Sequence, residues 1–139
     1  KASTGRMSDY TQTRTVDCLG SVYTVVVHRF VDKSLAMAKD ESGNEYYDNK
    51  ISVRIHRQDG TPFFDKTFTK ADFSSHLPED VATDGALLGV VLDKAEGDHL
   101  RFAASVGSPD NVSDTFVPLV VNVSRTGDVT VSVDNDIDN

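Results

Sequence analysis

The side chains in this sequence best suited to metal binding or nucleophilic catalysis are four histidines and one cysteine. The histidines are His28, His56, His76 and His99. No two of them have the spacing of paired metal ligands, such as His-x-His or His-x-x-x-His. Cys18 stands in a stretch typical of a β-strand, and no histidine lies near it in the sequence to activate its thiol. We therefore expect scattered surface histidines, a cysteine in the core and no metal-binding residue.

Serine and carboxylate chemistry has no clear motif in the sequence either. There is no G-x-S-x-G elbow and no S-x-x-K motif, and Ser105 falls within a predicted strand rather than at a strand-to-helix turn. The 22 acidic residues are mostly Asp, and no pair of them stands out as the acid and base of a glycosidase. The sequence therefore identifies no catalytic residue and no cofactor-binding residue, and we expect no cofactor.

Two acidic stretches have the oxygen spacing that begins an EF-hand calcium loop. Residues 134–138 read DNDID, but they lack the glycine and the distal glutamate of such a loop and run into the C-terminus. Residues 40–44 read DESGN, and Ile51 occupies the position of the bidentate glutamate. We interpret both stretches as solvated polar segments rather than metal sites.

Net charge excludes one class of partner and disfavours another. The formal charge is -8 and the isoelectric point about 4.8, so there is no excess of basic residues to bind nucleic acid or an anionic membrane surface. We expect no nucleic-acid partner, and contact with a membrane only through a lipid anchor on the precursor. A single cysteine also rules out a disulfide within the chain.

Length and composition indicate one domain with a real core. The chain has 139 residues, 38% of them hydrophobic, with seven Phe and four Tyr to fill an interior. It has no apolar run long enough to span a bilayer. It starts without Met, so we expect a trimmed N-terminus from which an export signal was removed. We divide the chain into a flexible N-terminal tether (1–12), a single β domain (13–134) and an acidic tail (135–139).

Alternating apolar and polar residues predict β-strands along most of this domain. Strands are expected within 14–31, 50–57, 63–69, 86–92 and 100–106, and in a final hairpin over 116–133. The stretch 21–31 is apolar on both faces near its middle, which predicts a central strand covered on both sides. Asp59-Gly60 and Gly127-Asp128 supply hairpin turns, and Pro118 is expected at a strand start or on an edge.

One segment has a helical signal. Thr69 can act as the N-cap and Asp72 follows three residues later, as in a capping box. Pro78 is expected to end this helix near residue 77. We therefore predict an all-β, antiparallel sandwich or open barrel of about eight strands, with one short helix near residues 70–77.

Four stretches of the chain resemble a family of small Bacteroidetes cell-envelope lipoproteins, a domain of unknown function. They are DGTP (59–62), FTKADF (68–73), LRFAASVGSPD (100–110) and the GD turn at 127–128, and the resemblance extends over residues 15–134. It implies a precursor anchored by a lipid on a cysteine upstream of Lys1, and a cell-envelope location in a Gram-negative bacterium. Cys18 lacks a preceding lipobox and is not that anchor. The family brings no catalytic residues to this sequence.

These observations favour a non-enzymatic binding module for a protein, a glycan or a small ligand. The alternative is an enzyme with a dispersed active site that is not visible in the sequence. A deep pocket in which two or more histidines meet carboxylates would favour the enzyme. A flat surface with an exposed aromatic patch at Tyr46-Tyr47 would favour binding.

Overall fold

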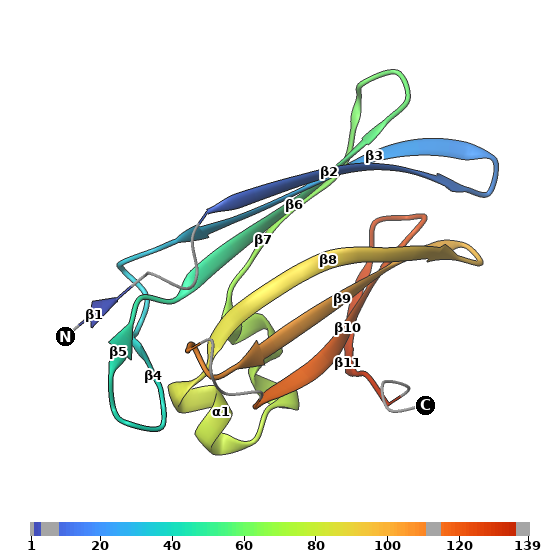
Figure 1. The fold of residues 1–139 in the computed structure, drawn as a ribbon. Helices are drawn as coiled ribbons and strands as arrows, with labels where there is room; N and C mark the ends of the chain where they lie inside the picture. Colours follow the sequence, from blue (N-terminus) through green and yellow to red (C-terminus); the bar gives the residue numbers. More distant parts are fainter. Residues whose placement is uncertain (1, 4–8, 111–114, 136–139) are drawn as a thin grey trace.

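Two antiparallel four-stranded sheets pack face to face in the computed structural model, which describes residues 2–3, 9–110 and 115–135 (Figure 1). In chain order the elements are β1 (Ala2–Ser3), β2 (Tyr10–Cys18), β3 (Ser21–Val31), β4 (Ala38–Lys39), β5 (Glu45–Tyr46), β6 (Asn49–Arg57), β7 (Pro62–Phe68), η1 (Lys70–His76), α1 (Glu79–Asp84), β8 (Ala86–Glu96), β9 (His99–Gly107), β10 (Phe116–Ser124) and β11 (Val129–Val133). One of the two four-stranded sheets has the order β2-β3-β6-β7 and the other β11-β10-β9-β8, and a small third sheet has the order β1-β5-β4. The predicted all-β sandwich is confirmed, and no closed barrel forms among the described residues.

The core lies between the sheets because each long strand turns alternate side chains inward. Ile51, Val53 and Ile55 of β6 are buried, as their spacing predicts. Phe73 of η1 packs against Phe68 of β7, with ring centroids 5.9 Å apart, so the short helix covers part of the core. Neither helix among the described residues is long and apolar enough to cross a lipid bilayer.

β3 departs from the prediction that it is covered on both sides. Val25 and Val27 are buried, whereas Val26 and His28 on the other face are only half-buried. The second sheet covers a single face of this strand, and the apolar residues on the outer face owe their presence to β-branched strand preference rather than to burial. β3 is nevertheless an inner strand of its sheet, as expected.

One strand boundary differs from that read in the sequence, and one further helix is present. β2 begins at Tyr10, so residues 10–12 belong to a strand and not to the N-terminal tether. The first helix ends at His76, just before Pro78, as expected, and Pro78 is then the N-cap of a second helix, α1, which the sequence reading missed. The fixed φ of proline suits a helix start, and Glu79 and Asp80 place negative charge in the first turn, where the helix dipole favours it. The first helix, η1, is a 3₁₀ helix.

The final hairpin, expected over residues 116–133, forms from β10 and β11. Leu119 pairs with Val133, Val121 with Val131 and Val123 with Val129. Pro118 lies near the start of β10, just beyond the Leu119–Val133 pair, which agrees with the expected position at a strand start. Its carbonyl oxygen accepts a 3.0 Å hydrogen bond from the Asp134 amide.

The free edge of β8 is bonded to side chains of the opposite sheet. Arg29 Nη1 donates to the Leu88 carbonyl oxygen and Arg14 Nη1 to that of Leu92, each at 2.7 Å. An unpaired strand edge otherwise exposes backbone groups that invite aggregation. These side chains therefore close one side of the sandwich without a backbone ladder between the sheets.

Candidate functional site

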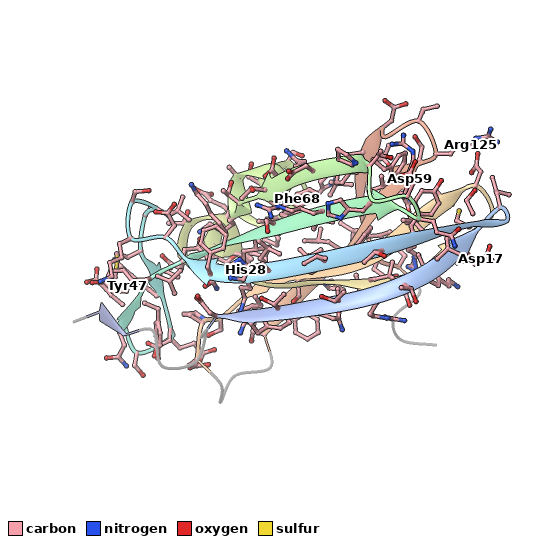
Figure 2. All side chains as sticks on the ribbon, turned by 90° about the horizontal axis from the view of Figure 1, so that it is seen from above. Asp17, His28, Tyr47, Asp59, Phe68 and Arg125 are labelled. Atoms are coloured by element: carbon pink, nitrogen blue, oxygen red, sulfur yellow. The ribbon has the colours of Figure 1, made fainter. Side chains whose placement is uncertain are left out.

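All four long hairpins turn at the same end of the sandwich. Each four-stranded sheet consists of two hairpins, and the pairing order places both turns of such a sheet at one end. The views in Figures 1 and 2 agree on this, since Asp17, Asp59 and Arg125 lie together at the end opposite Tyr47. Loops that converge on a rigid scaffold are common positions for binding sites.

An open cavity of about 290 Å³ lies between these turns. Its lining residues come from both sheets: Cys18, Leu19, Ser21, Tyr23, Phe63, Asp98, His99, Leu100, Val123, Ser124 and Arg125. We call it the hairpin-end cavity. Its volume is close to the lower end of the roughly 300–1,000 Å³ typical of small-molecule sites.

An aromatic pair is part of the lining of the cavity. The rings of Tyr23 and Phe63 have centroids 5.3 Å apart and are tilted by 44°. The Arg57 guanidinium carbon lies 5.4 Å from the centre of the Phe63 ring, and Arg57 Nη1 donates a 2.8 Å hydrogen bond to the Pro62 carbonyl oxygen. These contacts hold the two rings in place beside the β6–β7 turn.

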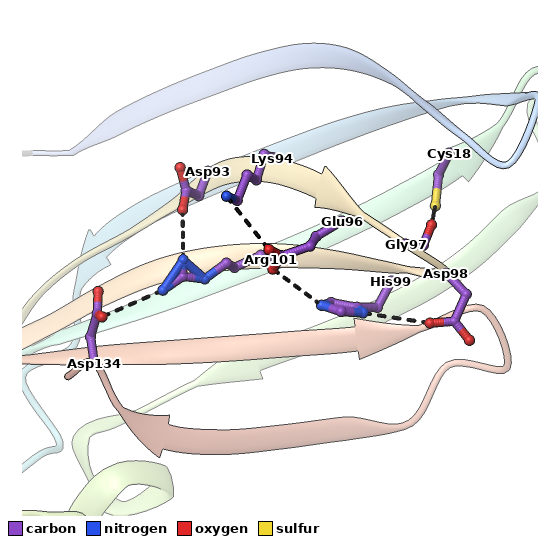
Figure 3. Close-up of polar contacts among 9 residues, drawn as sticks. All are labelled: Cys18, Asp93, Lys94, Glu96, Gly97, Asp98, His99, Arg101 and Asp134. Carbon is purple, nitrogen blue, oxygen red and sulfur yellow. Dashed lines mark hydrogen bonds and ion pairs between the residues drawn. The ribbon is translucent and has the colours of Figure 1, made fainter. Parts of the chain in front are cut away.

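Cys18 is a core residue, as predicted, at the inner side of the cavity. Its side chain is 7% exposed, and its thiol lies 3.9 Å from the Gly97 carbonyl oxygen (Figure 3). Burial raises the pKa of the thiol, and the negative charges of Asp98 and Asp17 raise it further. The thiol is therefore protonated at neutral pH, which is the opposite of an activated nucleophile.

His99 lines the cavity with a carboxylate facing each ring nitrogen. Its Nε2 is 3.7 Å from Glu96 Oε1, and its Nδ1 is 3.5 Å from Asp98 Oδ1 (Figure 3). The other three histidines lie elsewhere. His28 is on the outer face of β3, 4.0 Å from Asp9, His56 is on the outer face of β6, and His76 ends η1. The histidines are thus scattered, as expected, and the convergence that would favour an enzyme is not found among the described residues.

Three polar side chains that line the cavity are left unengaged by the fold. The hydroxyls of Ser21 and Tyr23 and the guanidinium of Arg125 have no hydrogen bond or ion pair to the part of the chain that the structure describes. By contrast, Ser124 Oγ is used by its own turn, where it accepts from the Asp128 amide at 3.0 Å. The unengaged groups are available to a ligand.

Leu19 is the one described residue other than glycine with a positive φ, at 54°, and it is 60% exposed at the rim of the cavity. It shares the β2–β3 turn with Gly20, at φ 81°, the pair of left-handed residues that a tight hairpin requires. Asn or Gly is favoured here, and a large apolar residue costs roughly 1–2 kcal/mol in this conformation. Strained, exposed residues of this kind are frequent at functional sites.

The acidic stretch at 40–44 forms a turn between β4 and β5. Asp40 Oδ1 accepts from the Ser42 and Asn44 amides, and Oδ2 accepts from Asn44 Nδ2 and the Tyr46 hydroxyl. N–H and O–H donors thus surround the carboxylate, whereas calcium requires oxygen ligands. These contacts support a structural turn here.

Two other features noted in the sequence are the acidic stretch at 134–138 and the Tyr46-Tyr47 pair. Within 134–138, Asp134 forms an ion pair with Arg101 at 3.5 Å, and residues 136–138 lie outside the described part of the chain. Tyr46 is 7% exposed and Tyr47 half-buried, so they form no exposed aromatic patch. Across the described residues, no group of three metal-binding side chains comes together.

The sequence reading did not single out Leu19, Tyr23, Phe63 or Arg125. The only local signal was the Leu-Gly pair at 19–20, where an apolar residue occupies a tight turn. The other residues lie in ordinary strand or turn patterns, and only the packing of the two sheets brings them to one cavity.

Comparison with protein families gives one result. A family model described as Domain of unknown function (DUF4738) matches residues 1–131. No curated protein matches the chain.

Proposed function

The chain belongs to the family described as Domain of unknown function (DUF4738), and from this premise we propose that it is a non-enzymatic module that binds a small ligand in the hairpin-end cavity. The observation that carries the proposal is the lining of that cavity. Apolar and aromatic side chains of both sheets lie beside polar groups that the fold leaves without partners. Small-molecule sites are concave and combine apolar side chains with a few convergent polar groups, and the lining of this cavity contains both kinds of group.

Chemistry at the same site favours binding over catalysis. Burial raises the pKa of the Cys18 thiol, so it is a poor nucleophile at neutral pH. His99 faces Glu96 and Asp98, and the thiol donates to the Gly97 carbonyl oxygen. A nucleophile and base would need to lie within hydrogen-bonding distance of one another.

Cavity size and position indicate the kind of ligand. A volume of about 290 Å³ accommodates a small molecule or one unit of a longer one. The cavity opens to solvent between hairpin turns, so the rest of a longer ligand can extend away from the protein. The rim residue Leu19 offers an apolar contact there, at the conformational cost described above.

A ligand screen read by protein NMR tests the proposal. We expect hits to shift the backbone amide signals of residues around the cavity and to lose affinity in Tyr23→Ala. Tyr47→Ala is the matched control, because Tyr47 is a half-buried tyrosine at the other end of the sandwich, under the Lys33 ammonium. Hits that shift signals elsewhere, with equal affinity for both variants, would contradict this site.

We further propose that the module acts in the cell envelope of a Gram-negative bacterium, tethered by a lipid on its precursor. The support is the resemblance of the stretches at 59–62, 68–73, 100–110 and 127–128 to envelope lipoproteins. Metabolic labelling of the natural precursor with an alkyne fatty acid tests the anchor. Label in the membrane fraction is expected, and an unlabelled protein in the cytosolic fraction would overturn the proposal.

A further inference from the structure

Arg125 stands out among the described arginines because the fold leaves its guanidinium without a polar partner. It lies in the β10–β11 turn and lines the hairpin-end cavity. Its guanidinium forms no ion pair or hydrogen bond with the described residues. Arg101, on the neighbouring strand, instead bridges Asp93 at 3.1 Å and Asp134 at 3.5 Å (Figure 3). A planar guanidinium presents two parallel N–H donors, which match a carboxylate.

The remaining lining of the cavity suits a ring with hydroxyl groups. Tyr23 and Phe63 offer an aromatic surface for the C–H face of such a ring. The unengaged hydroxyls of Ser21 and Tyr23 can each donate and accept a hydrogen bond. The carboxylate of Asp98 can accept hydrogen bonds from ligand hydroxyls, and its side chain is 67% exposed, so water and salt screen its repulsion of an anion.

We infer that the ligand of the hairpin-end cavity is an acidic sugar unit, whose carboxylate pairs with Arg125 while its ring packs against Tyr23 and Phe63. The inference rests on the proposed function, since it names the ligand class of the same site. A pyranose ring bearing a carboxylate combines an apolar face, several hydroxyls and one negative charge, and each of these has a counterpart in the cavity lining.

Two matched probes test the contribution of the carboxylate. Methyl β-D-glucuronide and methyl β-D-glucoside share the ring and differ only in the carboxylate or CH₂OH group at carbon 6. Each is titrated into the full chain to roughly 10 mM, enough to detect a dissociation constant near 1 mM, while amide signals of the cavity residues are followed by NMR. We expect the glucuronide to bind about tenfold or more tightly, as a charge-assisted pair implies.

Arg125→Gln should remove this preference. The variant is expected to bind glucuronide and glucoside with similar, weak affinity. Arg54→Gln is the control, because Arg54 lies on the outer face of β6, 3.8 Å from Asp65 and away from the cavity, and should keep the preference. Equal binding of the two probes, or a preference that survives Arg125→Gln, would overturn the inference. Absence of any shift with either probe would also overturn it.

A third probe separates the ring from the charge. Cyclohexanecarboxylate carries the same charge on a six-membered ring without hydroxyls, and we expect it to bind more weakly than the glucuronide. Binding of equal strength would show that the site selects carboxylic acids rather than acidic sugars, and would overturn the inference. The proposed function would then stand, because a small ligand would still occupy the cavity. It would fail separately if the ligand screen gave no hits around the cavity.

Discussion

The carboxylate of Asp48 accepts a 2.9 Å hydrogen bond from the backbone amide of Leu87, and this bond joins the two sheets. Asp48 precedes β6 in one sheet, and Leu87 lies near the start of β8 in the other. The next side chain, Asn49, donates from Nδ2 to the Leu87 carbonyl oxygen, also at 2.9 Å. Two consecutive side chains therefore satisfy both backbone groups of one edge residue, in a part of the structure that is inaccessible to water.

The first prediction concerns the stability that this bond supplies. Asp48→Ala leaves the Leu87 amide buried without its acceptor, which should lower the free energy of unfolding by about 1–3 kcal/mol. Asp48→Asn keeps an oxygen acceptor and removes a buried charge, so it should lie within about 1 kcal/mol of the parent protein. Urea denaturation followed by circular dichroism measures both changes.

Asp65→Ala is the control for this comparison. Asp65 is exposed and only 3.8 Å from Arg54, and exposed pairs contribute about 0–1 kcal/mol. If Asp48→Ala were no more destabilising than Asp65→Ala, the bond between the sheets would have no energetic importance.

The second prediction concerns pH, where two aspartates act in opposite directions. Burial raises the pKa of Asp48 above 3.8, against the opposing effects of the Leu87 and Asn49 amides and of Lys70. Between pH 3.8 and the raised pKa, the folded protein binds a proton that the unfolded chain has lost. The contribution of Asp48 to the free energy of unfolding therefore falls as pH rises through this window.

Asp32 has the reverse dependence. Hydrogen bonds from Lys50 Nζ at 2.7 Å and from the Ser34 hydroxyl at 2.6 Å hold its pKa well below the usual 3.8. Its contribution to stability is present above pH 3.8 and is lost as pH falls below that value. Unfolding free energies measured from pH 3 to pH 7 should show Asp48→Asn gaining stability relative to the parent protein as pH rises. The stability that Asp32→Asn loses relative to the parent should shrink as pH falls towards 3. If the unfolding free energies of both variants ran parallel to that of the parent protein across this pH range, the pKa shifts of Asp48 and Asp32 would both be refuted.

The third prediction concerns Leu19 at the rim of the cavity. Leu19→Asn should raise the free energy of unfolding by about 1 kcal/mol, because Asn adopts positive φ more readily and precedes Gly in the favoured two-residue turn. The same change should weaken binding of ligands found in the screen, since it removes an apolar contact. Gly20→Ala is the control and should destabilise the protein, because φ is 81° at that position. A loss of stability in Leu19→Asn would mean that Leu19 contributes packing in the free protein.

The fourth prediction concerns the reactivity of Cys18. Because burial raises the pKa of its thiol and restricts access, alkylation by iodoacetamide at neutral pH should be more than about tenfold slower than in urea-unfolded protein. A ligand that fills the cavity should slow the reaction further, because Cys18 lines it. Mass spectrometry over a time course gives the rates. Fast alkylation of the folded protein would contradict the buried, protonated thiol.

Much of the strand architecture follows from local sequence pattern. Ile51, Val53 and Ile55 alternate with polar residues, and a period of two places all three side chains on the same face of the strand. Gly127 has a positive φ of 86° in the last turn, which sets the register that pairs Val121 with Val131. The helix α1 was missed because its six residues include no buried one, so no apolar stripe marks it, and because Pro78 can begin a helix as well as end one.

The hairpin-end cavity was decided only by the tertiary structure. Its residues come from both sheets and are separated by up to 107 positions along the chain, from Cys18 to Arg125, and no local pattern records which turns will meet. That depends on how the two sheets stack and on side-chain bonds between them, such as that of Asp48 with Leu87. By itself the sequence determined strands, turns and the buried cysteine, because those follow from neighbours in the chain. A binding site assembled from both sheets depends on contacts between distant residues, which exist only once the sandwich has formed.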